Sequence, residues 1–298
     1  MIEKENWQPL THTETAELND AAIQLHHAAQ FVALFGNSLL PKAADDSQSS
    51  MVWLPALKAL ASQEANLQRR IRMALLYGSF ELQLINENRE TLGTFPLSGQ
   101  TKTTALSFVR TQVRPFGKKA DDIQPINHFQ LPETVYDKGM PFRMTSPVLF
   151  QELARYRHNA QLVLTEIAKQ YEYASAVATW PHHFDTGSVI PVKFDDQSNP
   201  TQTVGIGLAP AGPMINEFYF YVSHWQKKGK ADYSALPELP EGAEWQTGKW
   251  KGAILRISEV VKKESAEEQA TLVDGFLRAA VEASFGILEK EAVKSLAH

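Results

Sequence analysis

Apolar residues recur every three or four positions in several stretches of the chain, which is the period of an amphipathic α-helix. The two longest run from Ala16 to about Leu40 and from Leu149 to Ile167. Shorter stretches, Thr103 to Val113 and Gln269 to Ile287, follow later in each half. The pattern also favours a helix without clear boundaries after Pro55. We therefore expect each half of the chain to begin and to close with a helix.

Between these helices, polar and apolar residues alternate as they do in half-buried β-strands. In the first half, Ser79 to Ile85 alternates, and Thr91 to Leu97 returns after a turn as its hairpin partner. A connector with several turn signals then spans Lys118 to Pro141. The second half contains strand-like segments at 189–192, 202–208, 218–222 and 253–257. Helices combined with adjacent strands predict an α+β protein with mostly antiparallel strands.

The two halves share more than this order. The run from His27 to Val32 aligns without a gap on His158 to Val163, and a Trp-Pro segment follows each run, at Trp53 and again at Trp180. We therefore predict an internal duplication in which residues 1–140 form the first α+β repeat with its connector and residues 141–298 form the second. Two helix–sheet–helix halves are expected to pack about a pseudo-twofold axis, with a ligand cleft between them.

Composition narrows the class of protein. The chain has 298 residues, of which 43% are hydrophobic and 21% charged, as is typical of a globular protein with a core. The absence of cysteine excludes disulfides, thiolate nucleophiles and cysteine metal sites. A net charge of −5 without a concentrated basic patch argues against a nucleic-acid partner. We expect a cytoplasmic protein without a membrane partner, since no apolar run approaches the roughly 20 residues of a membrane span.

The densest group of chemically active residues is Trp180-Pro181-His182-His183-Phe184-Asp185. Imidazole and carboxylate groups are ligands that divalent transition metals accept. On an extended segment His183 and Asp185 share one face, whereas His182 points to the other. The cluster predicts a metal site at His183 and Asp185, with acid–base catalysis or substrate binding as an alternative. A further alternative is an ordered loop in which a histidine binds Asp185 or the backbone.

His27 and His158 form a second pair of candidates. Gln30 and Gln161 lie three residues later, on the same helical face as their histidines. Each histidine is about 200° from the apolar stripe of its helix. These two equivalent faces are predicted to line a cleft; the alternative is that they are solvated or make a buried polar contact.

A carboxylate beside an aromatic strand is the third candidate. Glu217 precedes Phe218 to Val222, in which Tyr219 and Tyr221 share one face of the strand. The glycines before it do not open a helix, which argues against a phosphate cradle. Aromatic rings next to a carboxylate suit sugars or cations, although they equally suit packing within a sheet.

Parts of the second half resemble a bacterial family catalogued as domain of unknown function 5996. The resemblance is carried by the segment from Trp180 to Asp185, by Ala209-Pro210, by Pro213 to Tyr221 and by Gly252 to Val261. Asp185 and Glu217 are the positions that match the family best. The resemblance implies a related architecture and offers no activity.

We therefore predict a polar–aromatic cleft that binds a small molecule. The residues expected to act as catalytic groups are Asp185, Glu217 and His183, and those expected to bind the ligand are Trp180, His182, Tyr219, Tyr221, His27 and His158. If the protein is an enzyme, hydrolysis or isomerisation by a carboxylate–histidine pair, assisted by a divalent transition metal, fits these residue types. The alternative is a non-catalytic protein that binds a protein partner or a second copy of itself as a homodimer.

Overall fold

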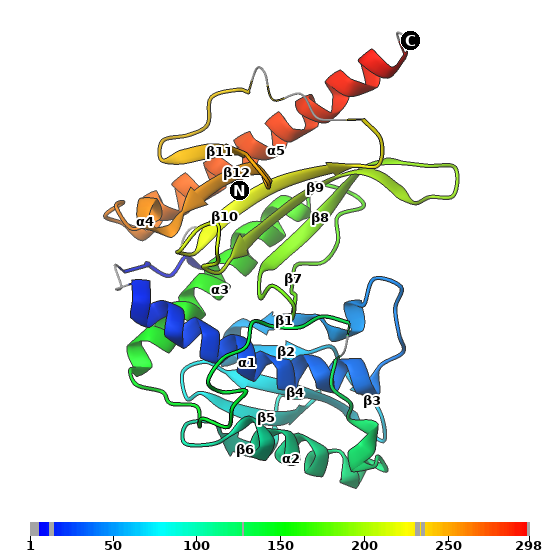
Figure 1. Cartoon of the computed structure of the whole chain (residues 1–298), viewed down its shortest axis with the longest axis vertical. Helices are drawn as coiled ribbons and strands as arrows, with labels where there is room; N and C mark the ends of the chain where they lie inside the picture. Colours follow the sequence, from blue (N-terminus) through cyan, green and yellow to red (C-terminus); the bar gives the residue numbers. More distant parts are fainter. Residues whose placement is uncertain (1–5, 12–14, 127, 230–232, 234–235, 297–298) are drawn as a thin grey trace. The chain divides into compact units, whose positions relative to one another are not determined.

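The computed structural model describes residues 6–11, 15–126, 128–229, 233 and 236–296. It divides the chain into two compact units, each assembled from more than one segment. The N-terminal unit comprises Thr13–Arg155 and Ala178–Phe184. The C-terminal unit comprises Met1–His12, Tyr156–Val177 and Asp185–His298. Each unit contains long helices and an antiparallel sheet, which confirms the α+β class (Figure 1).

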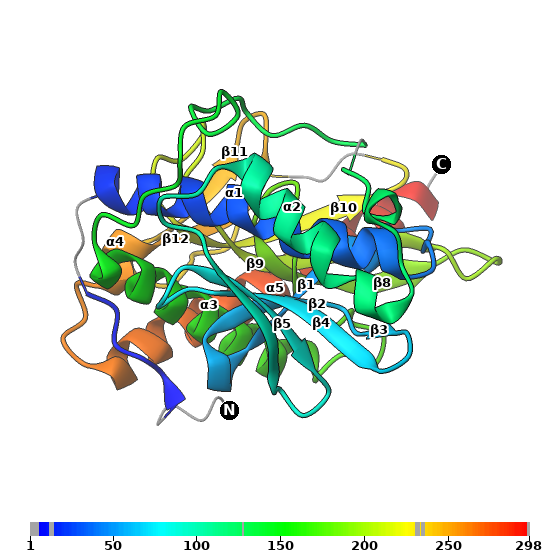
Figure 2. The same ribbon diagram turned by 90° about the horizontal axis from the view of Figure 1, so that it is seen from below.

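The N-terminal unit is an antiparallel sheet with two helices side by side on one of its faces (Figure 2). The strands lie in the order β7-β1-β2-β4-β5-β6, and the short β3 pairs with β4. Helix α1 packs on β2 and β4, and α2 contacts α1 and β6. The elements are α1 (Thr15–Leu39), β1 (Met51–Leu54), β2 (Ala59–Ser62), β3 (Ala65–Asn66), β4 (Arg70–Leu76), β5 (Glu81–Asn86), β6 (Thr91–Pro96), α2 (Lys102–Gln112) and β7 (Ala178–Thr179).

Helix α1 buries one face against this sheet because its apolar side chains recur at the helical period. Leu25, Ala28, Val32 and Phe35 on that face are completely inaccessible to solvent. Helix α2 begins at a capping box, in which the Thr101 hydroxyl accepts a hydrogen bond from the Thr104 amide while Thr101 N donates to Thr104 Oγ1. The helices predicted at Ala16 to about Leu40 and at Thr103 to Val113, and the predicted hairpin, are confirmed.

The helix expected after Pro55 is wrong. Pro55–Leu57 forms a single 3-10 turn, and β2, β3 and β4 follow it. The segment is rich in Ala, Leu and Arg, which favour helices in isolation, but a local propensity is a weak preference that tertiary pairing overrides. Here β2 pairs with both β1 and β4, and Ala59, Ala61 and Ala74 are fully buried. Sheet pairing decides the conformation.

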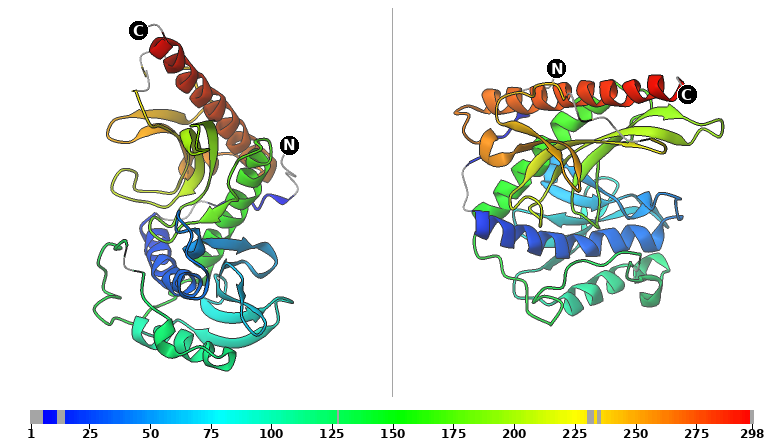
Figure 3. Two further views of the ribbon diagram at one scale, coloured as in Figure 1. Left: turned by 90° about the vertical axis from the view of Figure 1, so that its right-hand side faces the viewer. Right: turned by 45° about the horizontal axis from the view of Figure 1, so that its top comes forward.

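The C-terminal unit contains antiparallel strands in the order β11-β12-β10-β9-β8. The long helix α5 packs against β9, β10 and β12 (Figure 3). Phe218, Phe220 and Val222 are buried, whereas Tyr219 and Tyr221 are half-buried, as the alternation predicted. The elements are α3 (Pro147–Ala168), which begins in the N-terminal unit, β8 (Thr186–Phe194), β9 (Pro200–Ala209), β10 (Tyr219–Gln226), β11 (Ala243–Thr247), β12 (Lys251–Arg256), α4 (Ile257–Val260) and α5 (Ala266–Leu296).

The connector predicted from Lys118 to Pro141 contains neither an α-helix nor a strand in its described part, which lacks only residue 127. It is nevertheless held at several points. Just beyond its end, Gln24 of α1 donates through Nε2 to the Arg143 carbonyl and accepts from the Arg143 amide. Gln124 N donates to Ser38 Oγ. The connector therefore lies against α1 and closes one side of a cavity.

Candidate functional site

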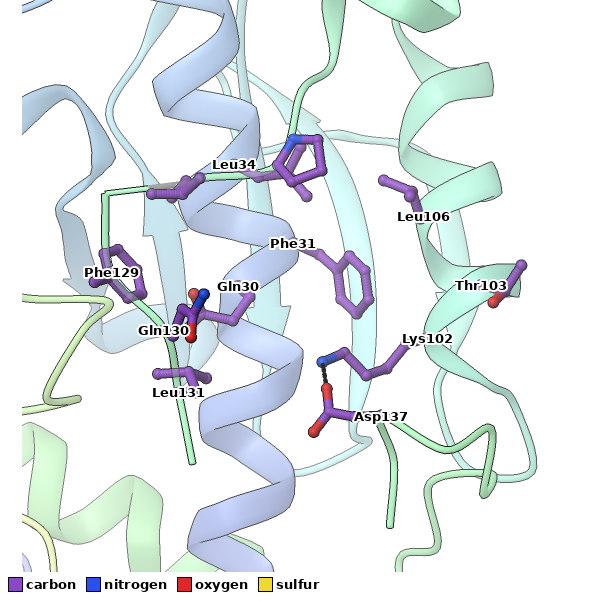
Figure 4. A pocket seen from close by; sticks show the side chains of 12 residues that line it. Gln30, Phe31, Leu34, Lys102, Thr103, Leu106, Phe129, Gln130, Leu131 and Asp137 are labelled. Carbon is purple, nitrogen blue, oxygen red and sulfur yellow. Dashed lines mark hydrogen bonds and ion pairs between the residues drawn. The ribbon is translucent and has the colours of Figure 1, made fainter. Parts of the chain in front are cut away.

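A cavity lies within the N-terminal unit, between α1, α2 and the connector. It has a volume of about 470 Å³. This is within the usual range of roughly 300–1,000 Å³ for small-molecule sites. Figure 4 shows the side chains around it, with Phe31 directed toward α2. The lining residues are Gln30, Phe31, Leu34, Lys102, Thr103, Leu106, Pro125, Ile126, Phe129, Gln130, Leu131 and Asp137.

The wall of this cavity is mostly apolar, and its charged groups form one ion pair. Lys102 extends from the first turn of α2, and its Nζ lies 2.5 Å from Oδ1 of Asp137 (Figure 4). Lys102 and Asp137 carry the charges among the lining residues. The cavity is therefore amphipathic, with a charged pair beside a hydrophobic wall.

The ion pair belongs to a closed ring of four hydrogen-bonded side chains. Lys102 Nζ also lies 3.2 Å from His27 Nδ1, and His27 Nε2 lies 3.4 Å from Thr134 Oγ1. Thr134 Oγ1 donates to Asp137 Oδ2 at 2.9 Å. Because an ammonium group only donates, His27 Nδ1 is the acceptor and the ring proton is assigned to Nε2. The ring joins α1, α2 and the connector and fixes the Lys102 ammonium at the cavity.

Burial keeps His27 neutral. The His27 side chain is 4% exposed. Desolvation, reinforced by the charge of Lys102, lowers its pKa to about 4, and Asp137 opposes this only in part. Burial acts to raise the pKa of Asp137, but hydrogen bonds from Lys102 and Thr134 outweigh it and lower that pKa to about 2. At neutral pH the ring therefore contains an ammonium, a carboxylate and a neutral imidazole.

The predicted Trp-Pro-His-His cluster lies next to this cavity, in a turn. His26 Nε2 is 2.8 Å from the Pro181 carbonyl oxygen, and Gln30, which lines the cavity, donates to the same oxygen at 2.9 Å. The buried Phe184 ring stacks on His26 with ring centroids 4.8 Å apart. The Phe184 amide donates to the Trp180 carbonyl. These contacts anchor the turn on α1.

The turn corrects the extended geometry expected for the two histidines. Residues 181–183 form the turn, and Phe184 has a left-handed φ of 58°. Proline fixes φ near the value that a turn requires. The strand-like alternation that placed His183 and Asp185 on one face therefore does not apply.

His182 and His183 are exposed at this turn, and their rings lie 4.5 Å apart. The His182 ring also lies 5.8 Å from that of Phe129, a cavity-lining residue, and 6.1 Å from that of Trp180. The structure thus brings His27, Trp180, His182 and His183 to one region of the N-terminal unit. Of these four, His27 reaches the cavity through Lys102, and His182 reaches it through Phe129.

The other sequence candidates belong to the C-terminal unit and have partners of their own. The Tyr221 hydroxyl donates to Asp185 Oδ2 at 2.7 Å. Glu217 accepts from the backbone amide of Ser258 at 2.9 Å and from its hydroxyl at 3.1 Å. His158 Nε2 lies 3.1 Å from the carbonyl oxygen of Asn6. Burial raises the pKa of Tyr219, with Asp185 adding to the effect.

No group of three or more His, Asp or Glu side chains arranged to hold a metal ion occurs among the residues that the structure describes. His183 and Asp185 lie in different units. Within the same described residues, no helix combines the length and hydrophobicity needed to cross a membrane.

Sequence reasoning missed Lys102, Asp137 and the apolar wall. A lysine at the start of a predicted helix is a weak signal, since it opposes the helix dipole. The length of the connector was a second signal, because long segments without regular structure are uncommon in a compact domain and are frequently functional. Neither signal indicated which residues meet in space.

Comparison with protein families, curated proteins and solved structures found no match to this chain.

Proposed function

We propose that the N-terminal unit binds a small, largely apolar molecule in the cavity between α1, α2 and the connector. The observation that carries this proposal is an apolar wall of Phe31, Leu34, Leu106, Phe129 and Leu131 ending at the Lys102–Asp137 pair. A concave apolar site with a few fixed polar groups is the usual form of a small-molecule site.

Binding is favoured over acid–base catalysis at this cavity. A general base acts best when its pKa lies near the working pH. The pKa of His27 is lowered to about 4, and both of its ring nitrogens face partners within the ring. His27 therefore serves to hold Lys102 in place. Hydrolysis or isomerisation through Asp185, Glu217 and His183, with or without a metal, is a second proposal that rests on residue types alone.

The duplication is also a proposal. It is supported by the order of elements, since a long helix, antiparallel strands and a closing helix occur in sequence in both halves. We also propose that the chain belongs to the family that its second half resembles.

The binding proposal can be tested with N-phenyl-1-naphthylamine, an uncharged apolar dye whose fluorescence rises when it is buried. We expect saturable binding of one dye per chain. Leu106→Trp fills the cavity from α2 and should weaken binding at least tenfold. Ser107→Trp, one residue along α2 on an exposed surface, is the matched control and should bind as the wild type does. Equal binding by both variants, or no saturable binding, would contradict the proposal.

A further inference from the structure

We propose that the ligand of this cavity is an apolar monocarboxylic acid, bound through its carboxylate to the Lys102 ammonium. This inference rests on the proposed function and specifies the chemical class of the ligand. It follows from counting the hydrogen-bonding capacity that the ring of four side chains leaves unused.

Lys102 has one hydrogen-bond donor that the ring of four side chains does not use. A lysine ammonium has three N–H donors. Among the described residues, Asp137 Oδ1 and His27 Nδ1 each take one of them. Lys102 lines the cavity, so one donor remains for a ligand there.

The acceptors of the ring are nearly all engaged. A carboxylate offers about four acceptor positions. Asp137 Oδ1 accepts from Lys102, and Oδ2 accepts from both the amide and the hydroxyl of Thr134. Both nitrogens of His27 are occupied by Lys102 and Thr134. A cationic ligand would therefore find little acceptor capacity and would be repelled by Lys102.

The remaining lining defines the rest of the ligand. Gln30, Thr103 and Gln130 are polar but neutral, and the other lining residues are apolar. Lys102 is the cation among the lining residues and already faces the carboxylate of Asp137, so a ligand with two or more negative charges, such as a diacid or a phosphorylated sugar, fits poorly. An aliphatic or aryl chain ending in one carboxylate would satisfy Lys102 and bury its apolar part. A hydrogen bond between ionised partners is about twice as strong as one between neutral groups.

The test compares octanoate with 1-octanol as competitors of N-phenyl-1-naphthylamine at pH 7. Apolar burial alone predicts that the alcohol competes at least as well as the acid. We expect octanoate to displace the dye at a concentration lower by roughly tenfold or more, because a hydrogen bond to a charged group adds to its binding.

Two variants with opposite expected effects separate recognition from structural damage. Lys102→Met should abolish the preference for octanoate, whereas Asp137→Asn should strengthen it by releasing Lys102 from its counter-ion. Damage to the fold would weaken binding in both variants. Lys138→Met removes a charge from the turn that contains Asp137, at an exposed residue that does not line the cavity, so this variant should retain the preference for octanoate.

The outcomes distinguish the two proposals. If wild-type protein binds the dye, Leu106→Trp blocks it, and octanol competes as well as octanoate, the cavity is a binding site but the carboxylate inference is wrong. If Lys102→Met does not fold, weaker octanoate binding by Asp137→Asn would also overturn the inference. If the dye does not bind saturably, the proposed function fails and the inference fails with it.

Discussion

The hydroxyl of Tyr221 donates a hydrogen bond to Oδ2 of Asp185 over 2.7 Å. Tyr221 pairs with Gly207 on the neighbouring strand β9, and Gly207 pairs in turn with Gly187 on β8. A Cβ atom on Gly207 would lie 2.6 Å from the Tyr221 ring, and one on Gly187 would lie 3.0 Å from its hydroxyl. The two glycines therefore leave the space in which the ring lies, and Asp185 holds its end.

This packing predicts a destabilising effect of Gly207→Ala. The added methyl group must displace a ring that is held on both sides, so the free energy of unfolding should fall by roughly 1–3 kcal/mol. Urea unfolding measures the change. In a Tyr221→Ala background the same substitution should cost much less, since the obstructing ring is gone. Gly212→Ala, where a Cβ meets open space, is the control. Equal losses with and without Tyr221 would contradict this account.

The depressed pKa of His27 predicts a pH dependence of stability. The folded-state pKa is about 4 and the ordinary value is 6.5, so the unfolded chain binds more protons between these values. The stability linked to the neutral His27 imidazole is fully present above pH 6.5. It declines as the pH falls toward 4, by at most about 3 kcal/mol. Lys102 and burial lower the pKa of His27, and Asp137 raises it.

The measurement is chemical unfolding at pH 7 and at pH 4.5, for wild type and for His27→Gln. The variant lacks the titrating group, so its stability should change less between the two pH values. Asp137 makes stability depend on pH in a lower range, between its ordinary pKa of 3.8 and about 2, so it does not affect the comparison between pH 7 and pH 4.5. Identical pH profiles for the two proteins would show that His27 is not buried in its neutral form.

Glu217 is expected to stabilise the C-terminal unit by capping α4. The residue preceding this helix, Arg256, provides no side-chain cap, whereas Glu217 accepts from both the amide and the hydroxyl of Ser258. Glu217→Ala should lower the free energy of unfolding by about 1–2 kcal/mol, in line with the loss of other helix caps. Glu238→Ala, at an exposed position, should have little effect. If Glu217→Ala leaves the free energy of unfolding unchanged, Glu217 does not cap α4.

Phe184 anchors the turn that carries the two exposed histidines. Its ring is 2% exposed and stacks on His26. Phe184→Ala should lower the free energy of unfolding by about 3 kcal/mol or more, because truncating a buried aromatic ring leaves a cavity. His182→Ala, on the exposed side of the same turn, should cost less than about 1 kcal/mol. Thermal or urea unfolding checks both, and comparable losses would show that Phe184 does not anchor the turn.

Where an element's conformation follows from its own periodicity, the sequence predicted it. Helix α1, the β5–β6 hairpin and the aromatic strand β10 lie close to the expected residues, and the alternation along β10 is as expected. His27, expected to face away from the apolar side of α1, is buried. Where pairing partners decide, the prediction failed. The segment from Ala59 to Leu76 has helix-forming composition but is held in strands by its neighbours in the sheet.

The candidate site residues were also predicted only in part. His27 of α1 and the Trp-Pro-His-His segment were recognised from residue types, and the structure places both beside one cavity. Asp185, Glu217, Tyr219, Tyr221 and His158 were recognised by the same reasoning but lie in the other unit.

The sequence by itself determined the α+β class, the periodic helices and strands, and the chemistry it excludes through its lack of cysteine, because these properties depend on composition or on residues within a few positions of one another. Only the tertiary structure decided where the site lies. Lys102 meets a partner 35 residues away in Asp137 and another 75 residues away in His27. No local pattern encodes such distances: the packing of α1, α2 and the connector brings the three side chains together and leaves the cavity beside them.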